Sequence, residues 1–269
     1  MATRLQLRSR WVLVTGASSG LGLEMARLLA REHGANLVLV ARRRERLEAL
    51  AAELQRAHGI QAVAVAADLA RDGAAERVLA EATAGGRTLS AVVLNAGVTY
   101  YGDALAQEPA ALQALLHTNV LGMVDLASRA ARHFLACSEP GALLLVSSVG
   151  SLMPLPYQAA YGASKAFVTS YGLSLGEELR GRGVSVTVFA PGGIATELLE
   201  LSGLDAKFKA GQLGVMEAPA CAARAVEALV ERRALVVPGL INQALAAVPR
   251  LLPRRFLASR VAALYRPAR

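Results

Sequence analysis

Short apolar runs alternate with longer segments of helical periodicity along most of this chain. The runs 11–15 (WVLVT) and 36–41 (NLVLVA) are almost continuously apolar, which is typical of parallel strands buried on both faces. Segments 21–33 and 43–57 repeat apolar residues at close to helical spacing, as crossover helices do. The pattern predicts an α/β fold with a doubly wound, mainly parallel seven-stranded sheet and helices on both faces. The seven predicted strands are 11–15, 36–41, 61–67, 90–95, 142–148, 184–190 and 234–238.

The composition favours one domain. The chain has 269 residues, of which 54% are hydrophobic and 19% charged, enough to bury one large core. No internal repeat, low-complexity segment or Gly/Ser linker divides it. We therefore predict a single domain over 1–269, with 241–269 as a basic, apolar C-terminal extension.

The net charge and the cysteines indicate which ligands and which cellular compartment to expect. Lys+Arg 29 against Asp+Glu 21 gives a net charge of +8, which favours anionic ligands or surfaces. Aromatic residues make up only 4% and no nucleic-acid motif occurs, so we predict no nucleic-acid role. The N-terminal residues have no apolar run of signal-peptide length, and the two cysteines, Cys137 and Cys221, have no metal-ligand spacing. We expect a cytoplasmic protein with two buried, reduced thiols.

A glycine-rich turn follows the first predicted strand directly. In TGASSGLG, Gly16, Gly20 and Gly22 precede an apolar helix. Glycines let the backbone approach a pyrophosphate, and the helix N-terminus adds N–H donors and a positive dipole. The spacing G-x-x-x-G-x-G differs from the general G-x-G-x-x-G fingerprint, and glycines can also be simple turn formers. In this context the turn predicts a dinucleotide site in a Rossmann fold.

The end of the second predicted strand indicates which dinucleotide binds. An acidic residue there would accept from the ribose 2′-OH of NAD, but the sequence has Ala41 followed by Arg42 and Arg43. An arginine can bind the 2′-phosphate of NADP with two parallel hydrogen bonds. We predict NADP(H) with Arg42 as the main phosphate ligand, whereas Arg44 fits a solvated helix face.

Several motifs together resemble the classical short-chain dehydrogenase/reductase family. They are TGASSGLG, NAG at 95–97, Asn119, SSVGSLMPLPYQAAYGASK at 147–165 and PGGIATE at 191–197, in the order of the family and spread over about residues 9 to 238. The resemblance implies an NADP(H)-dependent oxidoreductase that interconverts a carbonyl and an alcohol by hydride transfer. It also implies a homodimer or homotetramer that pairs through the long helices after the fourth and fifth strands.

The resemblance assigns four catalytic residues. Tyr161 is the general acid/base, Lys165 its activator, Ser148 the anchor of the substrate oxygen, and Asn119 the holder of a proton-relay water. Tyr161 and Lys165 are four residues apart, hence on one helix face, where an ammonium would lower the phenol pKa. The hydroxyl of Ser148 can donate to a carbonyl oxygen as charge develops, while Ser147 should point to the opposite side of its strand.

The same resemblance supplies the remaining cofactor contacts, and no metal is required because the cofactor supplies the hydride. The predicted cofactor-binding residues are Gly16, Ser18, Ser19, Gly20, Leu21, Arg42, Arg43, Asp68, Leu69, Asn95, Ala96, Gly97, Tyr161, Lys165, Pro191, Gly192, Ile194 and Thr196.

The substrate side is mostly apolar. Ser148, Met153, Tyr157 and Tyr161 are the predicted substrate residues, with Leu152, Leu155 and the loop 194–216 nearby. These segments contain no clustered arginine for a carboxylate, so we expect a hydrophobic ketone or aldehyde. The alternative is that the leucines pack a lid or a subunit interface.

The C-terminal segment 241–269 has six arginines and no acidic residue. After Pro253, apolar residues could form one face of a short helix: Phe256, Leu257, Val261, Leu264 and Tyr265. Such a helix could lie on an anionic membrane, but it is too short to span one. The alternatives are packing over the substrate cleft or against a neighbouring subunit. Two other functions stay open: a non-catalytic NADP-binding sensor or scaffold, and a peripheral membrane protein acting on lipid.

Overall fold

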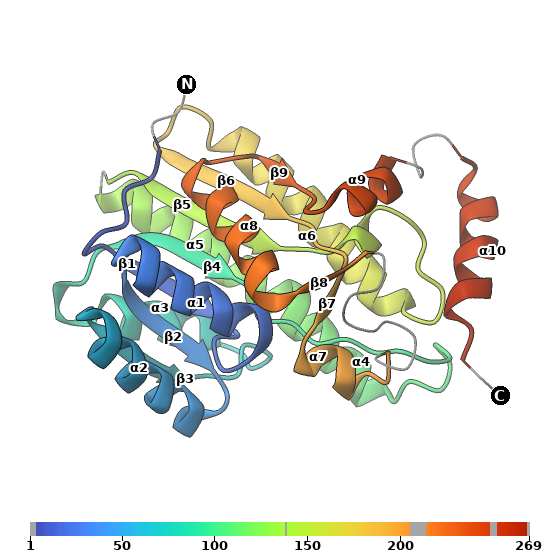
Figure 1. Cartoon of the computed structure of the whole chain (residues 1–269), viewed down its shortest axis with the longest axis horizontal. Helices are drawn as coiled ribbons and strands as arrows, with labels where there is room; N and C mark the ends of the chain where they lie inside the picture. The colour runs from blue at the N-terminus through green and yellow to red at the C-terminus, as the bar shows by residue number, and fades with distance from the viewer. Residues whose placement is uncertain (1–3, 138, 205–213, 248–251, 268–269) are drawn as a thin grey trace.

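The computed structural model describes residues 4–137, 139–204, 214–247 and 252–267. Its central sheet has seven strands, all parallel, in the order β3-β2-β1-β4-β5-β6-β9 (Figure 1). The predicted fold class is therefore confirmed. The strands are β1 (Trp11–Thr15), β2 (Asn36–Ala41), β3 (Ala62–Ala66), β4 (Leu89–Leu94), β5 (Gly141–Val146), β6 (Val184–Phe189) and β9 (Leu235–Val236).

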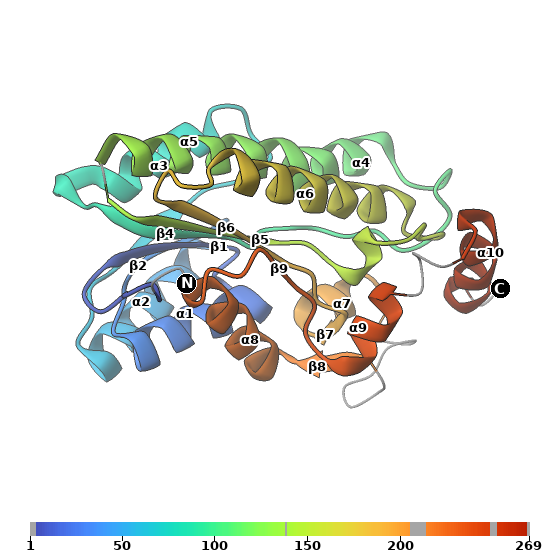
Figure 2. The ribbon, with the colours of Figure 1, turned by 90° about the horizontal axis from the view of Figure 1, so that it is seen from above.

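Helices cover both faces of the sheet (Figure 2). One layer contains α1 (Gly20–His33), α2 (Arg44–His58) and α8 (Ala218–Val230); the other contains α3 (Ala74–Thr83), α4 (Pro109–Leu116), α5 (Gly122–Cys137) and α6 (Ala159–Glu178). Alternate residues of β1 serve the two sides: Val12 and Val14 pack into the first core cluster, and Leu13 into the second. Both clusters are buried, which explains why the strands are apolar without interruption.

Three short elements at the carboxyl end of the sheet have no counterpart in the sequence prediction. Strands β7 (Gly193–Ala195) and β8 (Val215–Glu217) form a separate two-stranded parallel sheet, and α7 (Glu197–Leu201) follows β7. The two strands have three residues each and α7 has five, little more than one turn, so they show neither a continuous apolar run nor a helical repeat that would identify them. Helices α9 (Leu240–Ala247) and α10 (Arg254–Tyr265) complete this end, and α10 confirms the short helix expected after Pro253.

The helical stretch Pro109–Cys137 is long and apolar enough to cross a membrane by length and composition alone. In the structure its α5 part packs on the sheet, with Met123, Leu126 and Phe134 in the second core cluster. A π-helical turn, η2 (His117–Leu121), separates α4 from α5. Helix α5 therefore packs one apolar face against the sheet.

The two cysteines differ in environment. Cys221 is buried, as expected, and burial raises the pKa of its thiol to about 12. Cys137 is exposed, so the expectation of two buried thiols is wrong for this residue. It is the last residue of α5, where the helix leaves the sheet.

Candidate active site

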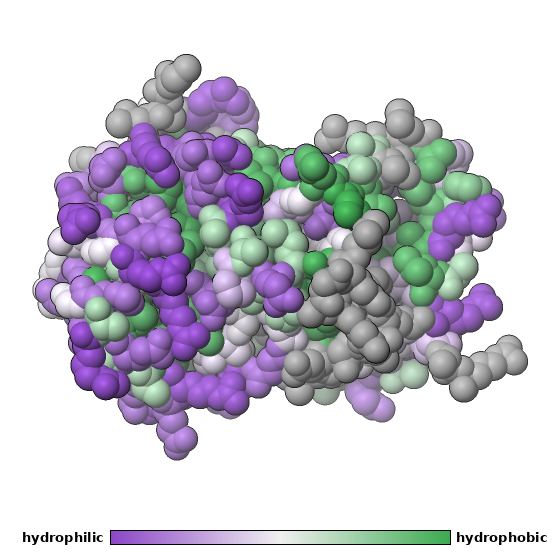
Figure 3. Space-filling model, in the orientation of Figure 1, coloured by the Kyte–Doolittle hydropathy of each residue, from purple (hydrophilic) through white to green (hydrophobic). Residues whose placement is uncertain are grey.

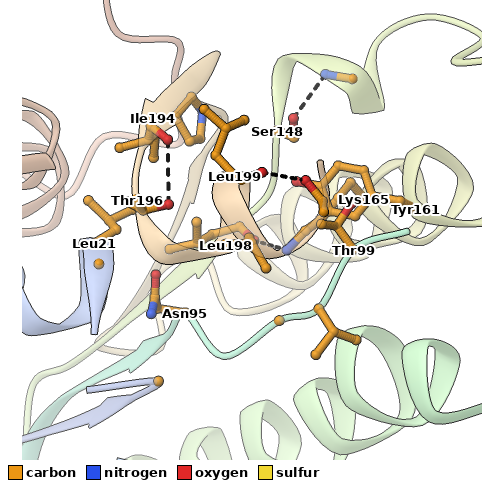
Figure 4. A pocket seen from close by; sticks show the side chains of 18 of the residues that line it. Leu21, Asn95, Thr99, Ser148, Tyr161, Lys165, Ile194, Thr196, Leu198 and Leu199 are labelled. Carbon is orange, nitrogen blue, oxygen red and sulfur yellow. Dashed lines mark hydrogen bonds between the residues drawn. The ribbon is translucent and has the colours of Figure 1, made fainter. Parts of the chain in front are cut away.

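A cavity of about 620 Å³ lies at the carboxyl end of the parallel strands. It spans the point where the strand order reverses between β1 and β4, where open α/β sheets bind ligands. Figure 4 shows Leu21, Asn95 and Thr196 on one side of this pocket and Ser148, Tyr161 and Lys165 on the other. All eighteen predicted cofactor residues line it, from Gly16 in the first turn to Thr196 after β7.

The glycine-rich turn forms a cradle that side chains would fill. Gly16 has φ +68°, a left-handed conformation that favours glycine. A Cβ on Gly22 would lie only 2.3 Å from the carbonyl oxygen of Gly16 and 2.5 Å from Asn95 Nδ2. Helix α1 begins at Gly20, so its unpaired N–H groups face the same turn. These features fit the pyrophosphate of a dinucleotide.

The two arginines after β2 that were predicted to bind the cofactor both border the pocket. Arg42 lines the pocket, but Arg43 makes the contacts with the glycine-rich turn, donating to Ser18 Oγ (3.1 Å) and Ser19 Oγ (2.8 Å). Arg43 also forms an ion pair with Glu197, the first residue of α7. The hydrogen bonds from Arg43 hold the pKa of the Glu197 carboxyl at about 2. Sequence reasoning missed Glu197, because no local pattern relates it to a residue 154 positions away.

Tyr161 and Lys165 lie on one face of α6, as their spacing predicts. Lys165 Nζ is 5.8 Å from the centroid of the Tyr161 ring and donates to the carbonyl oxygen of Val146 (2.9 Å). The Lys165 side chain is only 4% exposed, and this burial lowers its pKa to about 8. Its ammonium is therefore the larger population at pH 7.

Burial raises the pKa of the Tyr161 phenol, and a side-chain hydrogen bond with Ser148 opposes that change only in part. In the protein alone, the net direction of this pKa is therefore opposite to the lowering that we expected from Lys165. Desolvation penalises the phenolate more than its neighbours stabilise it. Tyr161 holds its proton at neutral pH.

The two serines at the end of β5 point in different directions, as predicted. Ser148 lines the pocket beside Tyr161, and its Oγ also accepts from the N–H of Gly150 (3.1 Å). The hydroxyl of Ser147 donates to the carbonyl oxygen of Lys165 (2.9 Å) and is buried. Both residues border the cavity, but the Ser147 hydroxyl is bonded to α6 and holds that helix against β5.

Asn119 lies behind the pocket wall, within η2. Its side chain is fully buried, accepts from the N–H of Val98 (2.8 Å), and donates to the carbonyl of Val98 (2.9 Å) and to Ser164 Oγ (3.1 Å). These bonds tie η2 to the chain after β4 and to α6. Its role as holder of a relay water stays a prediction.

Some of the residues predicted on the substrate side border the cavity. Met153 and Leu155 line the pocket, whereas Leu152 and Tyr157 do not. Tyr157 has φ +63°, and its carbonyl oxygen accepts from the N–H of Gly102 (2.9 Å), so it shapes a turn beside the site. The next residue, Gln158, lines the pocket and donates to Thr99 Oγ1 (2.9 Å). Tyr157, predicted as a substrate residue, is therefore not among the residues that line this cavity.

The C-terminal helices close this end of the cavity. Leu245 of α9 and Val261, Leu264 and Tyr265 of α10 line it, and the hydroxyl of Tyr101 donates to the carbonyl oxygen of Tyr265 (2.8 Å). Burial, with Tyr161 and Tyr101 as further causes, raises the pKa of the Tyr265 phenol to about 12. Of the alternatives for the C-terminal segment, packing over the cleft is the one that the structure shows. The parts of the predicted loop and tail at 205–213, 248–251 and 268–269 lie outside the described residues.

A parallel sheet whose strand order reverses beside a phosphate-binding turn defines a dinucleotide-binding α/β protein. Comparison with known proteins narrows this class. A family model described as short chain dehydrogenase matches residues 10–206. Serine 3-dehydrogenase of Agrobacterium fabrum is 37% identical over 191 residues, 69% of this chain and 72% of that enzyme. Human 17-beta-hydroxysteroid dehydrogenase type 3 is 30% identical over 196 residues; the match covers 72% of this chain but spans only 62% of the length of that relative.

Solved structures agree on the fold. A short-chain dehydrogenase from Sphingobium yanoikuyae in complex with NADPH has a TM-score of 0.79 at 30% identity, covering 91% of this chain and 97% of that one. The 3-ketoacyl-(acyl-carrier-protein) reductase from Brucella melitensis, complexed with NADH, has a TM-score of 0.75 at 25% identity, with 86% and 97% covered. The chain belongs to the short-chain dehydrogenase family of oxidoreductases, which use a nicotinamide cofactor.

Proposed function

We propose that this protein is an NADP(H)-dependent reductase of hydrophobic ketones or aldehydes, with Tyr161 as the proton donor. The observation that carries the proposal is the convergence of Ser148, Tyr161 and Lys165 on one side of the pocket that the glycine-rich turn opens. The contacts and burial of these three side chains support the roles proposed for them below. We place the activity in the cytoplasm.

The arginines after β2 support NADP(H) as the cofactor. Arg42 and Arg43 line the end of the pocket where a ribose 2′-phosphate would bind, and Ser18 and Ser19 add hydroxyl groups. Arg46 does not line the pocket but forms an ion pair with Glu197, which does. Ala41 provides no carboxylate to repel that phosphate. The NADPH complex of the Sphingobium yanoikuyae relative adds support by similarity.

We take carbonyl reduction as the working direction, for which the protonated form of Tyr161 is the one required. The bound cofactor supplies the hydride for the carbonyl carbon. Ser148 donates a hydrogen bond to the carbonyl oxygen, and Tyr161, whose phenol is kept protonated by burial, transfers its proton to that oxygen. The largely protonated Lys165 stabilises the tyrosinate that remains.

The substrate end supports a hydrophobic carbonyl compound. Met153, Leu155 and Leu199 line it from the body of the protein, and Val261 and Leu264 from α10. Among the described residues, Lys165 is the only arginine or lysine that lines this end, so these residues offer no clamp for a substrate carboxylate. The alternative of an NADP-binding sensor or scaffold predicts cofactor binding without turnover.

NADPH consumption against a panel of ketones, aldehydes and 3-ketoacyl thioesters tests the proposal. We expect turnover with apolar members of the panel and its loss, by at least a thousandfold in kcat, in Tyr161→Phe, while the Kd for NADPH stays within about twofold. If Tyr161→Phe turns over at the normal rate, the assigned chemistry is wrong. If the wild type binds NADPH but reduces no compound of the panel, the result supports the alternative of an NADP-binding sensor or scaffold.

A further inference from the structure

An internal carboxylate occupies the arginine site at the adenosine end of the pocket. Arg43 binds Glu197 through two parallel hydrogen bonds, Nη1 to Oε1 at 3.0 Å and Nη2 to Oε2 at 2.9 Å. Arg46 Nη1 lies 3.3 and 3.4 Å from the same two oxygens. The carboxylate of Glu197 is also hydrogen-bonded to Ser19. This is the geometry with which arginines bind a phosphate as well as a carboxylate.

The donors around Glu197 are the groups that the proposed function assigns to the 2′-phosphate. Ser18 and Ser19 belong to the glycine-rich turn, and both hydroxyls accept from Arg43 Nη2, at 3.1 and 2.8 Å. Glu197 reaches them from the other wall of the cavity, where α7 begins. A phosphate and the Glu197 carboxylate cannot use the same Arg43 fork together.

The position of α7 connects this contact to the rest of the pocket. Thr196, directly before Glu197, packs on the glycine-rich turn, with its Cγ2 3.1 Å from where a Cβ of Gly20 would be. Leu198 and Leu199, directly after it, line the cavity (Figure 4). The Arg43–Glu197 pair therefore holds α7 down on the site.

We propose that Glu197 is a built-in competitor for the 2′-phosphate site of Arg43, Ser18 and Ser19, and that it sets how strongly the protein prefers NADP(H) to NAD(H). This inference rests on the proposed function. One carboxylate neutralises only part of the charge of Arg43 and Arg46, whereas a phosphate monoester carries close to two negative charges at neutral pH. The exchange therefore favours the phosphate, and the displaced Glu197 releases α7 from Arg43.

Calorimetric titration with adenosine 2′,5′-bisphosphate and adenosine 5′-monophosphate tests the competition without turnover. We expect Glu197→Gln to lower the Kd for the bisphosphate about three- to tenfold, since partly exposed ion pairs are of modest strength. The Kd for the monophosphate should change less than twofold. Glu197→Ala should act in the same direction, and Arg43→Ala should weaken the bisphosphate selectively.

Glu53→Gln is the matched control. Glu53 also binds an arginine through two hydrogen bonds, with Arg27 at 3.0 and 3.2 Å, but neither residue lines the pocket. This variant should leave both constants unchanged. The inference is overturned if the Glu197 variants leave the bisphosphate constant unchanged, or if they tighten both nucleotides equally. Failure of the proposed function is a different observation, namely that the wild type does not consume NADPH with any carbonyl compound of the panel.

Discussion

At the scale of single residues, Lys165 is the most strongly constrained charge in the site. It is buried next to Tyr161, and the one hydrogen bond that its ammonium group makes to the described residues goes to the carbonyl oxygen of Val146. Burial moves its pKa from 10.5 to about 8. At neutral pH the folded state therefore buries an ammonium group that would be more stable in water, and this burial lowers the free energy of unfolding.

This cost should appear in the pH dependence of stability. Between pH 8 and 10.5 the unfolded chain binds a proton at Lys165 that the folded chain has lost, so this residue makes stability rise with pH in that window. The shift corresponds to about 3 kcal/mol at most. Urea denaturation of the wild type and of Lys165→Met at pH 7.5 and at pH 10.5 measures this effect. We predict that, between these two pH values, the unfolding free energy of the wild type rises relative to that of Lys165→Met by up to about 3 kcal/mol.

The difference between the two proteins is the quantity to measure, because Cys221 and Tyr161 also titrate in this range with the opposite sign. Both groups are common to the two proteins, so their contributions largely cancel. A difference that does not vary with pH would contradict the burial argument for Lys165.

At the scale of elements, α10 is divided between two surroundings. Leu257 is buried and Val261 and Tyr265 are half-buried toward the cavity, while Phe256 is 47% exposed. Hydrophobic side chains gather toward the end of the molecule that bears α9 and α10, whereas hydrophilic ones cover α1 and α2 (Figure 3). Leu240, Ile241 and Leu245 on α9 are also exposed. Helix α10 thus contributes Val261 and Tyr265 to the pocket wall and leaves the apolar side chain of Phe256 exposed.

The two sides of α10 predict different phenotypes. Leu257→Asp would bury a charge and detach the helix from the cleft, so we expect KM for an apolar carbonyl to rise at least fivefold while the Kd for NADPH is unchanged. Steady-state kinetics with equilibrium cofactor titration provides both numbers. An unchanged KM would show that α10 does not border the substrate.

Phe256→Asp is the control for the same helix, since Phe256 does not line the pocket and its substitution should leave KM unchanged. It also addresses the proposal that 241–269 contacts an anionic membrane. If that contact exists, Phe256→Asp lowers sedimentation with anionic vesicles. The membrane contact is rejected if the wild type and Phe256→Asp sediment equally with anionic vesicles and neither sediments more with them than with neutral vesicles.

Element by element, the sequence was most informative where burial imposed a period. Strands β1 and β2 match their predicted bounds, because continuous Val and Leu residues permit only a doubly covered strand. Local motifs likewise placed Gly16, Ser148, Tyr161 and Lys165 in one pocket. What could not be predicted depends on contacts between distant segments. Examples are the Arg43–Glu197 pair, the direction of Tyr157, and Asn242, a buried α9 residue packed against Gly192.

At the scale of the whole molecule, one helical layer leaves apolar side chains uncovered. Leu121, at the end of η2, is 56% exposed, and Phe167, on α6, is 46% exposed. Leu116 and Leu173 extend the surface on α4 and α6, and Figure 2 shows these helices in the same layer. We propose that this surface pairs with a second copy of the chain, which fits the expected homodimer or homotetramer.

Light scattering coupled to gel filtration tests this pairing. We predict that the wild type elutes as a dimer or larger assembly and that Leu121→Glu with Phe167→Glu halves its mass, because two carboxylates would face the partner copy. Leu105→Glu is the control, since Leu105 is 96% exposed on a loop between β4 and α4. A wild type that is already monomeric would contradict the proposal.

The central claim is that Tyr161 protonates a carbonyl while hydride arrives from the nicotinamide. Transfer of deuterium to an apolar ketone from NADPH that carries deuterium at both C4 positions, followed by mass spectrometry of the alcohol, measures that step directly. We predict one deuterium per product molecule with the wild type, and no labelled alcohol above background with Tyr161→Phe at saturating labelled cofactor. Unlabelled alcohol from the wild type, or labelled alcohol at the normal rate from Tyr161→Phe, would contradict the account.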